Sequence, residues 1–360
     1  MKKYLQIYKK LKAEILSGEI LPNAKLPSKR VTADIFGCSI ITVERAYGML
    51  VEEGYITSKE RSGYFVENID FLPKGSVSDY RIGSFLTEPT VKPDQDFEYS
   101  NYFKTVRKVI SEKSEELFIK APNEGCAVLR NAISRYLSRY RGMSAKPKNI
   151  IIGSGAEQLY ENVVKILGRE KIFGIESPCY EKINLVYGSE GVTLSPLKMG
   201  KDGILSSELK NKKFDVLHIT PFSSFPSGIT ATAKKRYEYL KIAKEKGIFI
   251  VEDDFASEFF KPGNPIESLY ATCVDDSVIY INTFSKSLSP SMRIGYMILP
   301  ERLLKTYQEK LGKFSCSVPV LEQYILAEFI DSGNFERHLN KERKKMKNKK
   351  IKTNQFFHQI

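Results

Sequence analysis

The chain has 360 residues, of which 42% are apolar, and a formal net charge of +13. The length predicts two or three domains, the apolar content excludes wholesale disorder, and the basic excess favours an anionic partner such as nucleic acid or an anionic membrane. Scattered cysteines and histidines argue against a disulfide framework or a zinc site, and the lack of an apolar run suited to a signal peptide or membrane span predicts a cytoplasmic protein.

The first 67 residues predict a small domain of their own. Periodicity predicts helices over 4–17, 28–36 and 40–53, followed by short strands over 55–58 and 64–66. Gly18, Gly37 and Gly54 are placed to end these helices, and Ser39 can cap the third. Three helices followed by a hairpin is the order of a winged helix-turn-helix, in which a short turn joins the second and third helices.

This arrangement predicts which residues would contact DNA. The third helix of such a domain meets base edges with its first residues, which here are Ser39, Ile40, Ile41, Thr42 and Arg45. The residues placed to contact phosphates or the minor groove are Lys29, Arg30, Lys59, Arg61 and Gly63. The alternative is a winged helix that makes only protein contacts.

The segment from Leu26 to Val66 carries a family resemblance. It contains LPSKR, then CSIITVERAYGMLVEEG, then SGYFV. This run resembles the GntR family of bacterial transcription regulators, whose pattern is LPSxR, SRxTVxxAYxxLxxEG and SGxFV. The sequence departs from that pattern at Ile40, where the family usually has an arginine, and the change removes a phosphate or base contact.

Residues 68–100 predict a linker, and residues 101–360 predict a large α/β domain. The linker is rich in Pro, Gly, Ser and Asp and has little periodicity. Beyond two helices, apolar runs alternate with amphipathic helices; these runs are NIIIGSG, KIFGIESP, FDVLHITP, GIFIVEDD, SVIYINTF and IGYMILP. Such alternation predicts a mostly parallel sheet covered on both faces, with ligands at the carboxyl ends of its strands.

Three of these strand ends carry candidate binding residues. The turn at Ser154 and Gly155 can hold an anion or serve only as a connection. The acids Glu252, Asp253 and Asp254 need a cation partner or a metal if they are buried. The third strand end carries hydroxyls and an arginine suited to a phosphate, and a lysine that can react with an aldehyde; these are Thr283, Ser285, Arg293 and Lys286.

The segment TFSKSLSPSMRIGY resembles the pyridoxal 5'-phosphate (PLP) lysine motif of fold-type I aminotransferases. Joined to a GntR head, it resembles the MocR subfamily of regulators over nearly the whole chain. The resemblance implies that Lys286 forms the internal aldimine, that Asp253 pairs with the pyridinium nitrogen and that Tyr180 stacks on the ring. The residues implied around the phosphate are Gly155, Ala156, Glu157, Thr283, Ser285 and Arg293. Tyr180 could instead be a core residue, and Glu157 could cap its helix.

Several positions depart from the family pattern. Ile119 and Phe255 stand where tyrosines usually contact the cofactor, and Phe222 and Ser223 replace a Ser-His pair. Fold-type I chains continue further, so the resemblance implies that the domain is truncated at its C-terminus and lacks the arginine that grips a substrate carboxylate. The basic segment 337–352 is expected to be a solvated helix, with DNA-backbone contact as the alternative.

Together these features predict a dimeric, PLP-responsive transcriptional regulator without catalytic or metal-binding residues. Two heads of a homodimer would bind operator half-sites in double-stranded DNA, and PLP, alone or with an amino acid or amine, would modulate that binding. One alternative is an active PLP-dependent aminotransferase. The other is a constitutive DNA-binding dimer whose cofactor site does not function.

Overall fold

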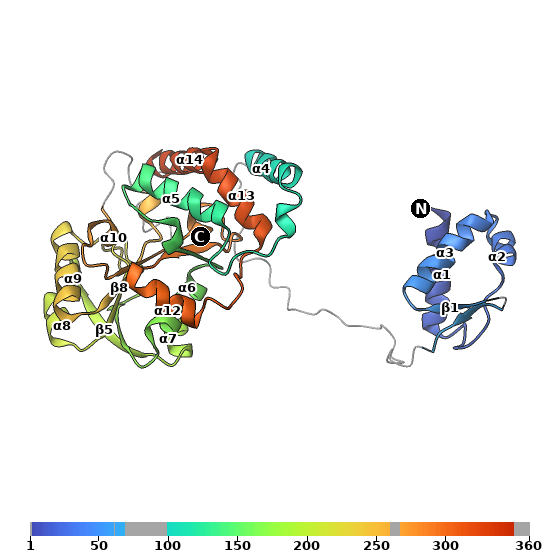
Figure 1. Cartoon of the computed structure of the whole chain (residues 1–360), viewed down its shortest axis with the longest axis horizontal. Coiled ribbons are helices and arrows are strands. Elements are labelled where there is room, and N and C mark those ends of the chain that lie inside the picture. Colours follow the sequence, from blue (N-terminus) through green and yellow to red (C-terminus); the bar gives the residue numbers. More distant parts are fainter. Residues whose placement is uncertain (1, 61, 69–98, 260–266, 349–360) are drawn as a thin grey trace. The chain divides into compact units, whose positions relative to one another are not determined.

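The computed structural model describes residues 2–60, 62–68, 99–259 and 267–348. The chain divides into two compact units, Met1–Thr90 and Val91–Ile360 (Figure 1). Almost all of the predicted linker lies outside the described residues. Within the described part of the chain, no helix is long and apolar enough to cross a membrane.

The first unit contains three helices and a hairpin, in the order that the sequence predicts. Its elements are α1 (Lys3–Ser17), α2 (Lys29–Phe36), α3 (Ile40–Glu52), β1 (Ile56–Lys59) and β2 (Gly63–Val66). Gly18 and Gly37 end α1 and α2 in the left-handed conformation, and the Ser39 hydroxyl accepts a hydrogen bond from the Thr42 amide at the start of α3. The winged helix-turn-helix prediction is therefore confirmed for this unit.

The second unit is built on an eight-stranded sheet. Its strands are β3 (Ile150–Gly153), β4 (Ile172–Ser177), β5 (Thr193–Gly200), β6 (Gly203–Ile204), β7 (Val216–Ile219), β8 (Phe249–Asp253), β9 (Val278–Thr283) and β10 (Gly295–Ile298). They lie in the order β3-β10-β9-β8-β7-β4-β5-β6, with β10 antiparallel to both neighbours and β6 antiparallel to β5. The remaining pairs are parallel, which confirms a mostly parallel sheet.

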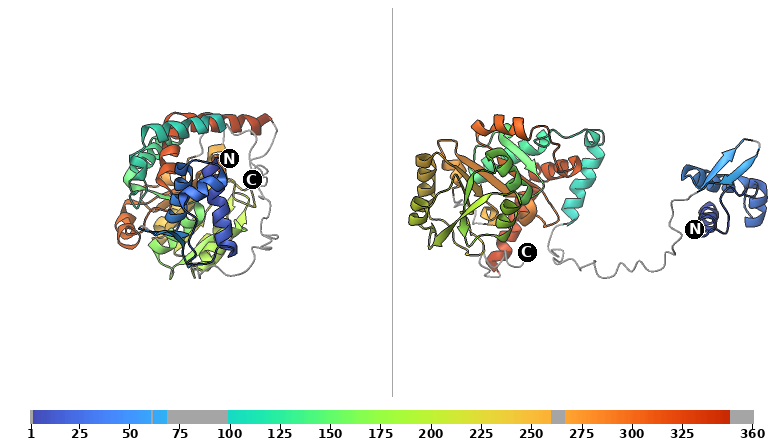
Figure 2. Two further views of the ribbon diagram at one scale, coloured as in Figure 1. Left: turned by 90° about the vertical axis from the view of Figure 1, so that its right-hand side faces the viewer. Right: turned by 90° about the horizontal axis from the view of Figure 1, so that it is seen from below.

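Helices cover both faces of this sheet (Figures 1 and 2). One face is packed by α5 (Ala127–Arg141), α8 (Ser206–Asn211), α9 (Ala233–Lys246), α10 (Leu269–Thr272), α13 (Val320–Asp331) and α14 (Asn334–Asn348). The other is packed by α6 (Ala156–Leu167), α7 (Glu181–Ser189) and α12 (Glu301–Lys310). A further helix, α4 (Tyr99–Glu112), packs on α13. The sheet is thus the middle of three layers, as its continuous apolar runs predict.

Two features differ from the sequence prediction. Strand β5, which lies between β4 and the short edge strand β6, was not predicted, because only Leu197 of its residues is buried and Pro196 interrupts the pattern. The basic helix α14 is not solvated all round, since Phe335 and Leu339 are buried in the core shared with α13. The exposed charges Arg337, Lys341 and Lys344 lie on the solvent side of this amphipathic helix, whereas Glu342 is buried.

Candidate functional site

Three chain segments meet at one edge of the sheet, the edge at which β3 and β9 end and β10 begins. Gly295, the first residue of β10, pairs with Gly153 at the end of β3 and with Thr283 at the end of β9. The turn after β3, the segment after β9 and the approach to β10 therefore meet at this edge. The end of β8 lies next to it, because Asp253 pairs with Ile281 of β9.

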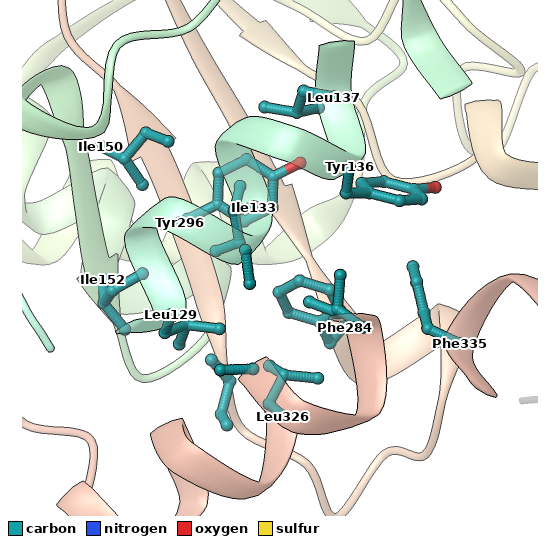
Figure 3. Packing of buried hydrophobic residues seen from close by; sticks show 14 of the residues in the cluster. Leu129, Ile133, Tyr136, Leu137, Ile150, Ile152, Phe284, Tyr296, Leu326 and Phe335 are labelled. Atoms are coloured by element: carbon teal, nitrogen blue, oxygen red, sulfur yellow. The ribbon is translucent and has the colours of Figure 1, made fainter. Parts of the chain in front are cut away.

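Lys286 lies at this edge in the short helix α11 (Phe284–Ser287). Phe284 anchors the helix, because its ring is buried among core side chains and lies 5.7 Å from the ring of Tyr296 (Figure 3). Lys286 itself is half-buried, and burial together with the nearby charge of Lys182 lowers the pKa of its amine. A lowered pKa increases the neutral, nucleophilic fraction of an amine near neutral pH.

Asp253 ends β8 and is buried among polar partners from other elements. The Tyr160 hydroxyl donates a hydrogen bond to its carboxylate, and His218 Nε2 lies 3.7 Å from Asp253 Oδ2. The Tyr187 hydroxyl oxygen lies 2.7 Å from His218 Nδ1. If Tyr187 donates to Nδ1, the Nε2 proton faces the carboxylate. Sequence reasoning missed these partners, although a single histidine inside the apolar strand VLHI was a visible signal.

The two acids beside Asp253 have separate structural roles. Asp254 pairs with Arg141 at 3.0 Å and accepts a hydrogen bond from the Tyr280 hydroxyl at 2.8 Å. Glu252 accepts bonds from two backbone amides at the start of α10, and burial raises its pKa to about 8. No group of three potential metal ligands occurs among the described residues. Arg141 is thus the cation partner that the sequence called for.

Arg293 and Lys182 lie together at the start of α6 and form what we call the cationic corner. Gly155 has φ +87°, and a Cβ atom there would lie 3.2 Å from the Arg293 guanidinium. The Glu157 carboxylate receives two cations, Arg293 at 3.4 Å and Lys182. Two cations on one carboxylate leave a net positive charge beside the helix N-terminus, an arrangement that suits an anion. Lys182 was not predicted from the sequence.

The other residues predicted around the cofactor lie along the same segments. Ala156 is the first residue of α6, Thr283 is buried at the end of β9, and the Ser285 hydroxyl donates to the Met292 carbonyl at 2.8 Å. Tyr180 immediately precedes α7 and is 37% exposed, so it is not a core residue. Its ring meets that of Phe225 edge to face at 6.0 Å.

The positions that depart from the family pattern have clear environments. Ile119 is exposed, whereas Phe222 is fully buried and Ser223 has a φ of +59°. Phe255 packs against a small buried cluster of Ala256, Phe259 and Met346. None of these apolar side chains offers the polar contact that the family residue would supply.

A buried acid that the sequence did not single out lies at the end of β4. Glu176 accepts hydrogen bonds from the hydroxyls of Thr220 and Ser224, the latter at 2.6 Å. Burial raises the pKa of Glu176 to about 7, although the two hydroxyls act in the opposite direction. This carboxyl fixes the loop after β7 to β4.

The first unit leaves its predicted DNA contacts accessible to solvent. Ser39, Arg45, Arg30 and Lys59 are exposed, and Thr42, Lys29 and Gly63 are half-buried, whereas Arg61 lies outside the described residues. Lys29 pairs with Glu44, and the Arg45 guanidinium lies 4.3 Å from the centre of the Tyr4 ring. The start of α3 is therefore an exposed surface that is flanked by cations.

Comparisons with known proteins match both units. Residues 3–66 match the bacterial regulatory proteins of the gntR family, and residues 95–357 match aminotransferase class I and II. The uncharacterized HTH-type transcriptional regulator YdeL of Bacillus subtilis is 34% identical, over 96% of this chain and 77% of its own length.

Two further relatives have more specific names. The probable rhizopine catabolism regulatory protein MocR of Rhizobium meliloti is 28% identical, over 94% of this chain and 74% of its own. The HTH-type pyridoxine biosynthesis transcriptional regulator PdxR of Corynebacterium glutamicum is 24% identical, over 94% and 75% of the two chains. These matches extend across both units.

A solved structure shares the fold of the second unit. The α-aminoadipate aminotransferase LysN of Thermus thermophilus, complexed with N-(5'-phosphopyridoxyl)-L-leucine, is 25% identical with a TM-score of 0.62. The match covers 71% of this chain and 66% of that structure, so the chain spans slightly less than two thirds of its length. The fold of the second unit is therefore that of a fold-type I aminotransferase.

Proposed function

The chain belongs to the MocR subfamily of GntR-family transcriptional regulators, and on that premise we propose that its second unit binds PLP and thereby modulates DNA binding by the first. PLP would act alone or with an amino acid or amine. The protein would act as a homodimer whose two heads occupy operator half-sites. The name of the relative PdxR and the phosphopyridoxyl ligand of LysN support this choice of cofactor.

The residues at the edge of the sheet fit this cofactor. Lys286 would hold its aldehyde carbon, and Asp253 would hold the ring nitrogen in its protonated form. Tyr180 would cover the ring. The residues that would surround the phosphate are Gly155, Ala156, Glu157, Thr283, Ser285 and Arg293, with Lys182 added by the structure. When bound, PLP supplies an electron sink for carbonyl and amine chemistry.

One observation carries the proposal. Lys286, a half-buried lysine with a lowered pKa, follows β9. The buried Asp253 carboxylate ends the adjacent strand β8. The cationic corner at the start of α6 follows β3, which lies on the other side of β9 from β8. The Lys286 amine matches the aldehyde of PLP, the Asp253 carboxylate matches its ring nitrogen, and the cationic corner matches its phosphate. Each group alone has an ordinary structural explanation, but their placement together favours a cofactor site.

The first test is attachment of the cofactor. Purified full-length protein mixed with PLP should develop a visible absorption band that Lys286→Ala lacks. Lys165→Ala, which removes an exposed lysine paired with Glu161 on α6, should keep the band. If Lys286→Ala keeps the band as well, another amine holds the cofactor and the assignment of Lys286 is wrong.

The second test is the link to DNA. A PLP titration should change operator affinity of the wild-type protein and leave that of Lys286→Ala unchanged, because a ligand shifts a conformational equilibrium only through differential affinity. Constant affinity across the titration would favour a constitutive DNA-binding dimer. Turnover of an amino acid with a keto acid would instead favour an active aminotransferase.

A further inference from the structure

The recognition helix α3 begins with apolar residues that the fold leaves outside. Ile41 is 77% exposed and Ile40 is 43% exposed, whereas Val43, Ala46 and Tyr47 of the same helix are fully buried. An isoleucine side chain gains stability when it leaves water, so folding of this unit does not account for the two positions. They form an adjacent apolar pair at the part of the helix that meets base edges in a helix-turn-helix.

The polar residues around the pair have partners within the first unit. The Ser39 hydroxyl caps α3 and lies 2.8 Å from the Thr42 hydroxyl. Glu44 pairs with Lys29, and Arg45 stacks on Tyr4. Ile41 is the most exposed large apolar side chain of α3, so this turn offers an apolar surface to a base pair.

We propose that Ile40 and Ile41 recognise thymine through its C5-methyl group in the major groove of the operator. The thymine methyl is the apolar group on the major-groove edges of unmodified base pairs, whereas an arginine that reaches a base edge selects guanine. This inference rests on the proposed DNA binding of the first unit. It adds a base preference that the winged-helix fold alone does not specify.

The charges around the pair suit this role. Arg30 at the start of α2 and Lys59 at the wing are exposed, so they can contact phosphates beside the groove. Phosphate contacts fix the position of the helix but carry little sequence information. The apolar pair at the first turn of α3 can then contribute to the discrimination between bases.

The experiment uses the full-length protein and DNA selected from a random-sequence duplex pool. Thymines in the selected half-site are replaced singly by deoxyuracil, which removes only the methyl group. At the position read by the helix, this change should weaken wild-type binding about fourfold, the factor for one buried methyl group. Ile41→Ala and Ile40→Ala should bind more weakly and lose this dependence at the thymine that each side chain contacts.

Val51→Ala is the matched control, because Val51 is an exposed apolar residue at the far end of the same helix. It should retain the wild-type response to deoxyuracil. Ile40→Arg should shift the selected base from thymine towards guanine. Selection of a defined site that tolerates deoxyuracil throughout would overturn methyl recognition while leaving DNA binding intact. Failure to select any sequence would instead count against specific DNA binding by the first unit.

Discussion

The two units differ in how many of their candidate functional residues are buried. In the first unit these residues lie on an accessible surface, and one of them, Ser39, also stabilises its own helix. In the second unit, Asp253 and Thr283 are buried at strand ends, and Asp253 has partners from α6 and β7. Apart from Ser39, the first surface can therefore change with little effect on folding, whereas the second site shares Asp253 and Thr283 with the core.

This difference shows where an ionised side chain reduces the stability of the folded chain unless it has a partner. The acids at the strand ends of the second unit, Glu176, Glu252, Asp253 and Asp254, are buried and need partners or protons. In the first unit, Glu44 and Glu53 instead form ion pairs at the surface. Measurements that compare the two units within the same chain can test the contrast, because each unit serves as the control for the other. Hydrogen exchange followed by mass spectrometry reports both at once.

The largest expected effect comes from breaking the buried ion pair of the second unit. Arg141→Met leaves Asp254 without its cation, which should cost about 3–5 kcal/mol of unfolding free energy. Exchange of β8 and β9 amides should accelerate while that of α3 amides stays the same. Arg135→Met, which removes an exposed pair with Asp331, should cost no more than about 1 kcal/mol. Equal losses from the two variants would contradict the contrast.

The next effect is a dependence on pH that affects the second unit. Burial raises the pKa of Glu176 to about 7 and that of Glu252 to about 8, from 4.5 in the unfolded chain. The stability that these carboxyls contribute is complete below pH 4.5 and is lost as pH rises through the folded values. Urea unfolding should therefore show a loss of a few kcal/mol from about pH 5 to about pH 8.

The first unit should not share this loss. The bond from Lys12, followed by that from Tyr8, lowers the pKa of Glu53, so its contribution is present above the unfolded value and is lost only in acid. Glu176→Gln should reduce the pH dependence of the second unit. A second unit whose stability rises over the same range would show that these acids are ionised in the folded protein.

The smallest effect concerns helix caps. Ser39→Ala removes the hydroxyl that accepts the Thr42 amide and should cost about 1 kcal/mol, measured as faster exchange in α3. Thr232→Ala removes the corresponding cap of α9, where the hydroxyl accepts the Lys235 amide. Each variant should affect only its own unit. Faster exchange in both units from either change would show that the units are thermodynamically coupled.

Local pattern was sufficient to predict much of the fold. The periodicities and end signals predicted α1, α2, α3 and the hairpin, and six apolar runs predicted the strands that carry the site. The rule for parallel strands also predicted that Asp253 and Lys286 would lie at one edge, and their strands are adjacent. These features depend on neighbours in the sequence or on a general rule of topology.

Partners from distant segments could not be predicted in the same way. Arg141 is the last residue of α5 and looks like an ordinary charge at a helix end, yet it is buried against Asp254. Lys182 and Tyr160 likewise lie on amphipathic helices, and only the packing of α6 and α7 brings them to the site. Strand β5, one strand in from the edge, lacks the apolar run that identifies central strands, because little of it is buried.

Gly295 pairs with Gly153 on one side and Thr283 on the other, and this row of paired residues lies beside the candidate cofactor site. Its position in the chain determines when in folding the site can be completed. Strand β10 joins two strands, one of which comes from a much earlier part of the chain, so this row closes a long loop and belongs to the slow, non-local part of assembly. A ligand that needs the completed row binds only the folded chain and stabilises it by mass action. Cofactor supply would then set how much folded protein a cell holds, in addition to how that protein behaves.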